Sequence, residues 1–165
     1  MEGLTALTLL TGTVTTGLMA GLFAGFAYAV MPGLGRGDDR TFTAAMRQIN
    51  RAILNGWFLS CFLGTPVVLG LAVVLLWTGE DRSALPPAAA GLALYLVVFA
   101  VTAAGNVPLN GRLDADGGGG EDGDAAARER FESSWNRWNT VRAAACTAAL
   151  ACLAWALVVY GGGAR

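Results

Sequence analysis

Four long stretches of this chain contain no charged side chain, and short polar segments separate them. A helix needs roughly 20 mostly apolar residues to cross a bilayer, and each stretch is longer than that. Because every backbone group in lipid must find its hydrogen-bond partner within the segment, the stretches predict helices. The pattern therefore predicts an all-α fold, a four-helix transmembrane bundle in a single integral membrane domain of residues 1–165. The uncharged runs cover residues 3–35, 52–79, 83–111 and 143–164, and the predicted spans are about residues 4–31, 52–78, 86–108 and 138–160.

A short amphipathic segment separates the first two predicted spans. Over residues 38–50, apolar side chains recur at spacings of three and four residues, with arginines between them. This is the period of a helix with one apolar face. We expect an interfacial helix that lies along the inner membrane surface before the second span begins.

Glycine and proline mark two features inside the spans. Gly17, Gly21 and Gly25 recur every fourth residue, on one helix face. Such a stripe predicts the close approach of another helix, and a flat groove for a planar ligand is the alternative. Pro66 removes the N–H that would bond the carbonyl of Phe62, so a kink is expected near residues 64–65.

Composition agrees with a membrane protein. Hydrophobic residues make up 55% of the chain and charged residues 14%, which is below the share in a soluble domain. The net charge of −1 provides no basic surface, so nucleic acid is not an expected partner. The expected partners are the lipid bilayer and a small ligand, and the sequence leaves homo-oligomer formation open.

The arginines indicate an orientation. All eleven basic residues are arginine, and nine of them lie after the first and the third span, on one side of the membrane if the spans alternate. The positive-inside rule then places the arginine-rich segments in the cytoplasm and both termini outside, in a multi-pass protein of the inner membrane. Only Arg82 and Arg165 lie on the other side. The nine are Arg36, Arg40, Arg47, Arg51, Arg112, Arg128, Arg130, Arg137 and Arg142.

No metal site is predicted. The chain has no histidine, which is the usual ligand of haem, copper and zinc and the commonest general base. Cys61 lies in the second span and Cys146 and Cys152 in the fourth, without paired spacing, and all three are expected to be small buried residues. The segment 114–124, DADGGGGEDGD, is predicted to be a flexible acidic loop. A calcium loop of EF-hand type would need a ligand where Gly118 stands and a glutamate where Ala125 stands.

Polar and aromatic residues gather at the inner ends of the predicted spans. Each alone has an ordinary interpretation, since asparagines cap helices, tryptophans anchor at interfaces, and arginine reaches toward headgroups. Buried amides and a guanidinium are costly unless they pair or bind a ligand, so together they favour one shared pocket. The residues are Tyr28 and Met31 in the first span, Asn50 and Asn55 at the second, Asn106 and Asn110 at the third, and Trp135, Trp138, Asn139 and Arg142 on one face of the fourth.

Four segments carry a resemblance to a known family. Residues 28–32 read YAVMP, 46–55 read MRQINRAILN, 106–110 read NVPLN and 131–142 read FESSWNRWNTVR. Their order and spacing around four spans resemble the anthrone oxygenase-like family of small integral membrane proteins, over nearly the whole chain. Fungal members oxidise anthrones to anthraquinones in polyketide biosynthesis. The resemblance therefore implies a membrane oxygenase that acts on a small apolar aromatic substrate.

This chemistry assigns roles to the predicted site. An anthrone carries an acidic C–H opposite its ketone, and the enolate left by deprotonation can pass an electron to dioxygen without metal or flavin. No cofactor is therefore predicted, and dioxygen is the co-substrate. Arg142, Asn106, Asn110 and Asn139 are the expected donors to the enolate oxygen, and Trp135 and Trp138 are expected to stack on the rings. Glu132 is the candidate base, or else the partner of Arg128 four residues earlier.

Two other classes of protein stay open. One is a redox protein that holds haem or a quinone, in which Met31, Met46, Tyr28 or a cysteine would replace histidine as iron ligand. The other is a non-catalytic carrier or assembly protein, in which the amides only fix helix packing.

Overall fold

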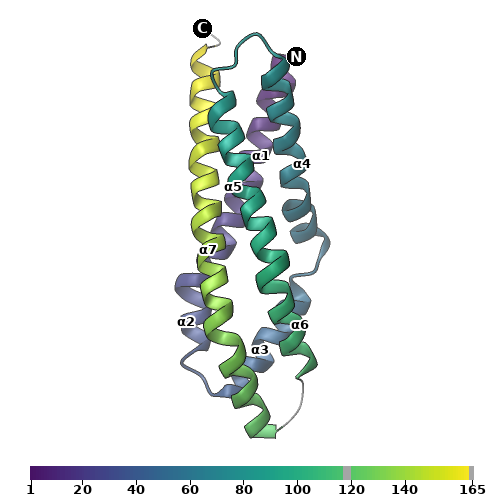
Figure 1. The fold of residues 1–165 in the computed structure, drawn as a ribbon, viewed down its shortest axis with the longest axis vertical. Helices are drawn as coiled ribbons and strands as arrows, with labels where there is room; N and C mark the ends of the chain where they lie inside the picture. The colour runs from purple at the N-terminus through teal and green to yellow at the C-terminus, as the bar shows by residue number, and fades with distance from the viewer. Residues whose placement is uncertain (117–119, 164–165) are drawn as a thin grey trace.

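The computed structural model describes residues 1–116 and 120–163, and in this part of the chain every regular element is helical (Figure 1). Four helical rods are long and apolar enough to cross a membrane: Glu2–Leu34, Gly56–Thr78, Leu85–Ala115 and Asp122–Gly163. The predicted four-span, all-α architecture is confirmed, and the chain is a multi-pass membrane protein. In order, the elements are α1 (Glu2–Gly25), η1 (Phe26–Val30), α2 (Met31–Leu34), α3 (Asp39–Ala52), α4 (Gly56–Thr78), α5 (Leu85–Val101), η2 (Thr102–Asn106), α6 (Val107–Ala115) and α7 (Gly120–Gly163).

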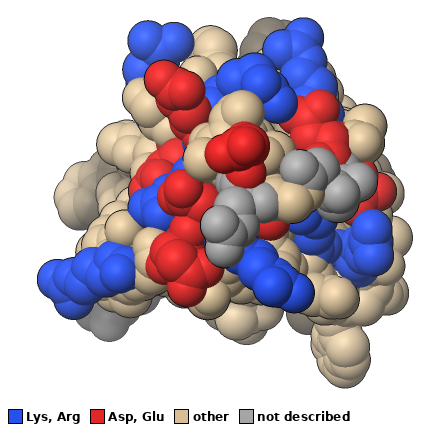
Figure 2. All heavy atoms as spheres, turned by 90° about the horizontal axis from the view of Figure 1, so that it is seen from below, with Lys and Arg blue, Asp and Glu red and all other residues tan. Residues whose placement is uncertain are grey.

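The helical rods differ in length, and the longer ones extend beyond α4. The molecule therefore has two parts, a spanning bundle and a smaller group of helices at one end. Both termini and the connection between α4 and α5 lie at one end, whereas α2, α3, α6 and the first turns of α7 lie at the other (Figure 1). The second end carries most of the arginines, and acidic side chains lie between them (Figure 2). We call this the arginine-rich end. The spanning part of the bundle therefore continues into a smaller helical unit.

Each part has its own core. Phe23, Phe62, Tyr95 and Leu153 are buried between the spanning helices. At the arginine-rich end, a second core forms where α3 crosses α6 and α7, with Met31, Phe42, Met46, Leu113, Phe131 and Trp135 buried together.

Helix α3 is the amphipathic helix predicted over residues 38–50. Asp38 caps it, because its carboxylate accepts a hydrogen bond from the Thr41 N–H at 2.8 Å, and this bond holds the pKa of Asp38 below its usual value. Phe42 and Met46 on its apolar face are completely buried in the second core. That face is covered by protein.

The two η segments are π-helical turns, and each directly precedes an X-Pro pair. The N–H of Met31 bonds to the carbonyl of Phe26, and the N–H of Val107 to that of Thr102. Pro32 and Pro108 have no N–H to continue the ladder, and the wider turn accommodates this break. The extra residue rotates every later side chain by about 100° around the helix axis. Residues that follow each π turn therefore point in a different direction from the one that a regular helical period predicts.

The acidic loop predicted over residues 114–124 is wrong at both ends. Residues 117–119 lie outside the described part of the chain. Asp114 belongs to α6, and α7 begins at Gly120, whose φ of +74° is accessible mainly to glycine. Asp124 is buried, and its Oδ1 accepts hydrogen bonds from the Thr43 hydroxyl at 2.8 Å and from Arg47 at 3.4 Å. Ionic contacts with α3 thus order residues that composition alone indicates to be loop.

A tyrosine hydroxyl takes the backbone carbonyl that Pro66 frees. Pro66 has no N–H, so the carbonyl of Phe62 lacks its usual partner in the helix. The hydroxyl of Tyr95, which is completely buried, donates a hydrogen bond to this carbonyl at 3.2 Å. A buried carbonyl without a partner would destabilise the bundle by about 1–3 kcal/mol. The contact also fixes α5 against α4.

The glycine stripe does not pack as predicted. A Cβ at Gly17 would touch Leu150 at 3.6 Å, but at Gly21 and Gly25 it would meet nothing within 4 Å, so close packing there is wrong. The tight approaches lie elsewhere. A Cβ at Gly91 would stand 2.8 Å from the side chain of Leu153, and others at Gly12 and Gly105 would also collide with neighbouring helices.

Candidate functional site

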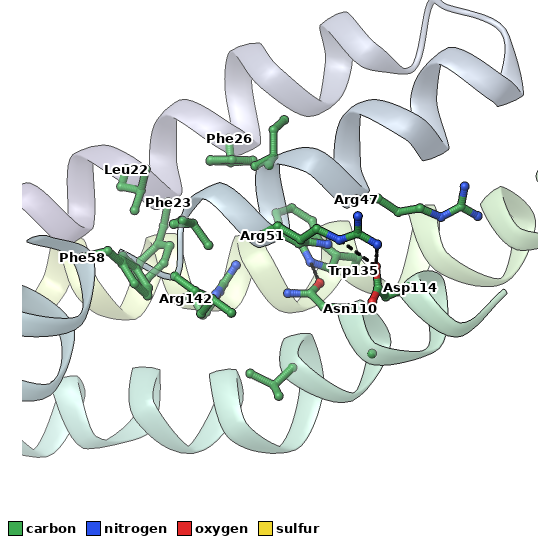
Figure 3. A pocket seen from close by; sticks show the side chains of 16 residues that line it. Leu22, Phe23, Phe26, Arg47, Arg51, Phe58, Asn110, Asp114, Trp135 and Arg142 are labelled. Atoms are coloured by element: carbon green, nitrogen blue, oxygen red, sulfur yellow. Dashed lines mark hydrogen bonds and ion pairs between the residues drawn. The ribbon is translucent and has the colours of Figure 1, made fainter. Parts of the chain in front are cut away.

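A cavity of about 310 Å³ lies where the spanning bundle meets the helices of the arginine-rich end (Figure 3). Its walls come from α1, α3, the start of α4, α6 and α7. We call it the central cavity. Its apolar lining is Leu22, Phe23, Phe26, Ile49, Ile53, Leu54, Phe58 and Val107, and its polar lining is Arg47, Asn50, Arg51, Asn110, Asp114, Trp135 and Arg142, with Gly111 completing the wall.

Arg142 is the dominant polar group of the central cavity. Its residue is 7% exposed, and none of the ion pairs among the described residues includes it. Its guanidinium lies 4.4 Å from the Phe23 ring centroid and 5.4 Å from that of Trp135. Aromatic faces offset part of the cost of burying a cation, but a carboxylate would offset much more. The cavity wall therefore holds a cation that no carboxylate neutralises among the described residues.

Asn139 fixes the position of this guanidinium. Nη2 of Arg142 donates to Oδ1 of Asn139 at 2.8 Å, and Nδ2 of Asn139 donates to the carbonyl of Phe23 at 3.0 Å. Asn139 is 1% exposed and lies behind Arg142. Through these two bonds, α1 holds the arginine of α7 in one orientation.

Trp135 forms a flat part of the wall. Its Nε1–H donates to Oδ1 of Asn110 at 2.9 Å, and its ring packs between those of Phe26 and Phe131. Behind it, Asn106 of η2 donates from Nδ2 to the Trp135 carbonyl at 3.4 Å, while its own Oδ1 accepts no hydrogen bond from any residue that the structure describes. Trp135 is 4% exposed, so its ring is held rigidly.

An ion pair stands at the opposite end of the central cavity. Arg51 of α3 contacts Oδ1 of Asp114 through Nη2 at 2.6 Å and through Nε at 3.2 Å (Figure 3). The two side chains are 63% and 53% exposed, so this end is open to water. Leu54 and Val107, 67% and 55% exposed, add apolar surface to the lining.

The structure brings six of the predicted site residues together. Asn50, Asn110, Trp135 and Arg142 line the central cavity, and Asn106 and Asn139 lie directly behind that wall. Nδ2 of Asn50, like Nε of Arg142, is buried without a hydrogen-bond partner among the described residues. The six come from α3, η2, α6 and α7, as expected for inner helix ends that converge.

Five predicted site residues lie elsewhere. Glu132 bonds Nε of Arg128 through its Oε2 at 2.7 Å and lines a separate hollow of about 200 Å³ with Met31 and Asn136. At about 100° per residue it lies on the same side of α7 as Asn139, but its carboxylate is directed to Arg128 and is not in the lining of the central cavity. The ion pair with Arg128, the alternative interpretation of Glu132, is confirmed.

The other four have structural environments of their own. Asn55 caps α4 by accepting from the Phe58 N–H at 3.0 Å. Trp138 is 37% exposed and covers Gly105 on the outside of the bundle, and Tyr28 is 73% exposed. Met31 is buried in the second core together with Met46. The prediction placed Tyr28 and Met31 by their depth at the end of the first span, and depth alone does not fix the direction in which a side chain leaves the helix.

Sequence analysis missed Asp114, Arg51, Arg47 and the phenylalanines of the cavity wall. Asp114 follows Asn110 by four residues, and Arg47, Asn50, Arg51 and Leu54 recur at three and four, so both sets share a helix face. That spacing was a usable signal. The glycines after Asp114 concealed it, because they indicate a loop.

Comparison with known proteins gives one match. Residues 57–152 match the model of a family described as Anthrone oxygenase, and the matched range includes Asn106, Asn110, Trp135, Asn139 and Arg142. No curated protein and no solved structure matches the chain.

Proposed function

This chain belongs to the anthrone oxygenase family, and on that premise we propose that it oxidises an apolar aromatic, anthrone-like substrate with dioxygen in the central cavity. The observation that carries this proposal is the environment of Arg142. A buried guanidinium among aromatic rings, with no carboxylate partner in the described part of the chain, suits a planar aromatic anion. The enolate of an anthrone is such an anion.

Arg142 would act on the charge that forms during the reaction. When the benzylic proton leaves, negative charge develops on the ketone oxygen. A donor fixed in advance beside that oxygen stabilises the transition state more than it stabilises the neutral substrate. Asn139 provides this fixed position through its bond to Nη2. The rings would be enclosed by Trp135, Phe23, Phe26 and Phe58, which keep water from the end of the cavity at Arg142.

The reaction balances without a further redox group. A base removes one benzylic proton, and the electron pair of the C–H bond becomes that of the enolate. The enolate gives one electron to dioxygen, and the carbon radical and superoxide combine into a C–O bond. The peroxide takes up a proton, and loss of the second benzylic hydrogen with cleavage of the O–O bond leaves a ketone and water. Substrate and dioxygen supply all the electrons, so no cofactor is required by this chemistry.

Oxygen uptake by the purified protein in detergent tests the proposal. With an unsubstituted anthrone we expect one dioxygen consumed for each quinone formed, at a rate well above that in empty micelles. The optical spectrum of the same sample should lack haem and flavin bands. Quinone formation no faster than in empty micelles would refute the oxygenase, and a haem band would favour the redox-protein alternative.

We also propose that the arginine-rich end faces the cytoplasm, with both termini outside. The support is the distribution of arginines. Two exposed positions test it, Ser83 between α4 and α5 and Arg36 between α2 and α3. In intact cells, a membrane-impermeant maleimide should label Ser83→Cys and not Arg36→Cys, with the unmodified chain as background. The reverse pattern would invert the topology.

A further inference from the structure

We propose that Asp114 is the general base that takes the benzylic proton of the substrate, at the end of the central cavity opposite Arg142. This inference rests on the proposed oxidation. It identifies the general base that the proposed reaction needs. The chain has no histidine for this role, and Glu132 does not line the central cavity.

The central cavity has two polar ends. Arg142 stands beside Phe58 at one end, and Asp114 with Arg51 stands at the other, with Asn110 between them (Figure 3). Asn110 bonds Trp135, so the two helices are level there. Asp114 lies one turn beyond Asn110, about 6 Å along α6, and Arg142 lies two turns from Trp135 in the other direction, about 10 Å along α7. The proposed base and the oxyanion donor are therefore separated along the axis of the helix bundle.

The substrate has the same arrangement. In an anthrone, the ketone and the acidic C–H lie on opposite sides of the central ring. One orientation of the rings against Trp135 directs the ketone oxygen toward Arg142 and the benzylic carbon toward Asp114. A base beside Arg142 could not serve both atoms at once.

No other carboxylate among the described residues lines the central cavity. Asp124 and Glu132 of α7, which pair with Arg47 and Arg128, are not part of this lining. The chain has neither histidine nor lysine. The carboxylate of Asp114 is therefore the side chain in the cavity lining that can act as a base.

The contact with Arg51 leaves one oxygen of Asp114 free. Both Nη2 and Nε of Arg51 bind Oδ1, whereas Oδ2 accepts no hydrogen bond among the described residues. In the proposed step, the C–H bond breaks, its electron pair stays on the substrate as the enolate, and the proton passes to Oδ2. The side chain is 53% exposed, so the proton can continue to bulk water.

Hydrogen exchange without oxygen isolates this step. The protein is incubated anaerobically with an anthrone in D₂O, and the loss of benzylic protons is followed by NMR. General base catalysis contributes about 10²–10⁴-fold. We therefore expect Asp114→Asn to lower both the exchange rate and the kcat of aerobic oxidation by about 10²-fold or more, with little change in KM. Asp114→Glu keeps a carboxylate and should recover part of both rates.

Two controls separate a base from a structural ion pair. Asp116→Asn removes a comparable carboxylate next to the end of α6, one that pairs with Arg130 at 2.9 Å outside the cavity, and should leave both rates unchanged. Arg51→Gln breaks the same ion pair as Asp114→Asn but keeps the carboxylate. If the pair only fixes α3 against α6, the Arg51 and Asp114 variants lose equal activity. If Asp114 is the base, Arg51→Gln keeps exchange at least about tenfold above Asp114→Asn.

The outcomes distinguish this inference from the proposed function. A wild-type protein that oxidises anthrone, with an Asp114→Asn variant that exchanges at the wild-type rate, overturns the base and leaves the oxygenase standing. Equal losses in the Arg51 and Asp114 variants also overturn it. A wild-type protein that neither exchanges nor oxidises any anthrone defeats the proposed function itself.

Discussion

Replacing Arg142 by methionine is expected to lower the kcat of anthrone oxidation by about 10²–10³-fold, the usual effect of removing one donor to a developing oxyanion. Methionine keeps much of the length of the side chain but removes the charge. The guanidinium is buried without a carboxylate, so its removal relieves the cost of a desolvated cation. The substitution also leaves the buried Oδ1 of Asn139 without its donor, so the two effects oppose each other and we expect the variant to fold about as well as the wild type. Oxygen uptake and the midpoint of thermal unfolding in detergent measure the two effects separately.

The matched control for this variant is Arg137→Met on the same helix. Arg137 is exposed and lies over the ring of Trp138 at 5.9 Å, outside the central cavity. The Arg137→Met substitution removes the same charge from α7 and should leave kcat unchanged. If both variants reduce turnover equally, the charge of the arginine-rich end matters rather than the site. If Arg142→Met loses folding together with activity, the arginine is a packing residue, as in a non-catalytic scaffold.

The largest effect on stability is expected for Gly91→Leu, in the contact between α5 and α7. A Cβ at this position would stand 2.8 Å from Cγ of Leu153, which is completely buried, and 3.4 Å from the backbone carbonyl of Ala149. Leu153 has no room to turn away, and the helix backbone behind it cannot yield locally. Overpacking of this kind costs about 1–3 kcal/mol, more than the gain of about 0.8 kcal/mol in helix propensity. The unfolding midpoint in detergent should fall.

Gly21→Leu is the control for this substitution. Gly21 lies in the stripe predicted to pack closely, but a Cβ there would meet nothing within 4 Å. The variant should be neutral or slightly more stable because leucine favours the helix. If Gly21→Leu instead destabilises the protein as much as Gly91→Leu, another chain occupies that face, and the protein is an oligomer.

The sequence predicted the depth of the site in the bundle and its polar residue types, but not the direction in which each side chain leaves its helix. Asn50, Asn106, Asn110, Trp135, Asn139 and Arg142 were all placed from sequence at the inner helix ends, and they do meet there. Successive spans cross the bilayer in opposite directions, so the end of the first span, the start of the second, the end of the third and the start of the fourth lie on the same side. This alternation is enough to predict that the six residues lie at one depth. Glu132 does lie on the same side of α7 as Asn139, but its carboxylate pairs with Arg128 and borders a separate hollow instead of the central cavity.

By itself, the sequence determined the number of spans, the amphipathic helix between the first two, and the resemblance to the family. Lipid requires each span to satisfy its own backbone, so length and apolarity are sufficient signals. Only the tertiary structure decided which side of each helix faces the cavity. The helices α1, α4 and α5 are apolar nearly all round, which leaves no polar face to mark their rotation. The π turns before Pro32 and Pro108 shift the side-chain directions further. Contacts between residues far apart in sequence, such as Arg51 with Asp114, then complete the site.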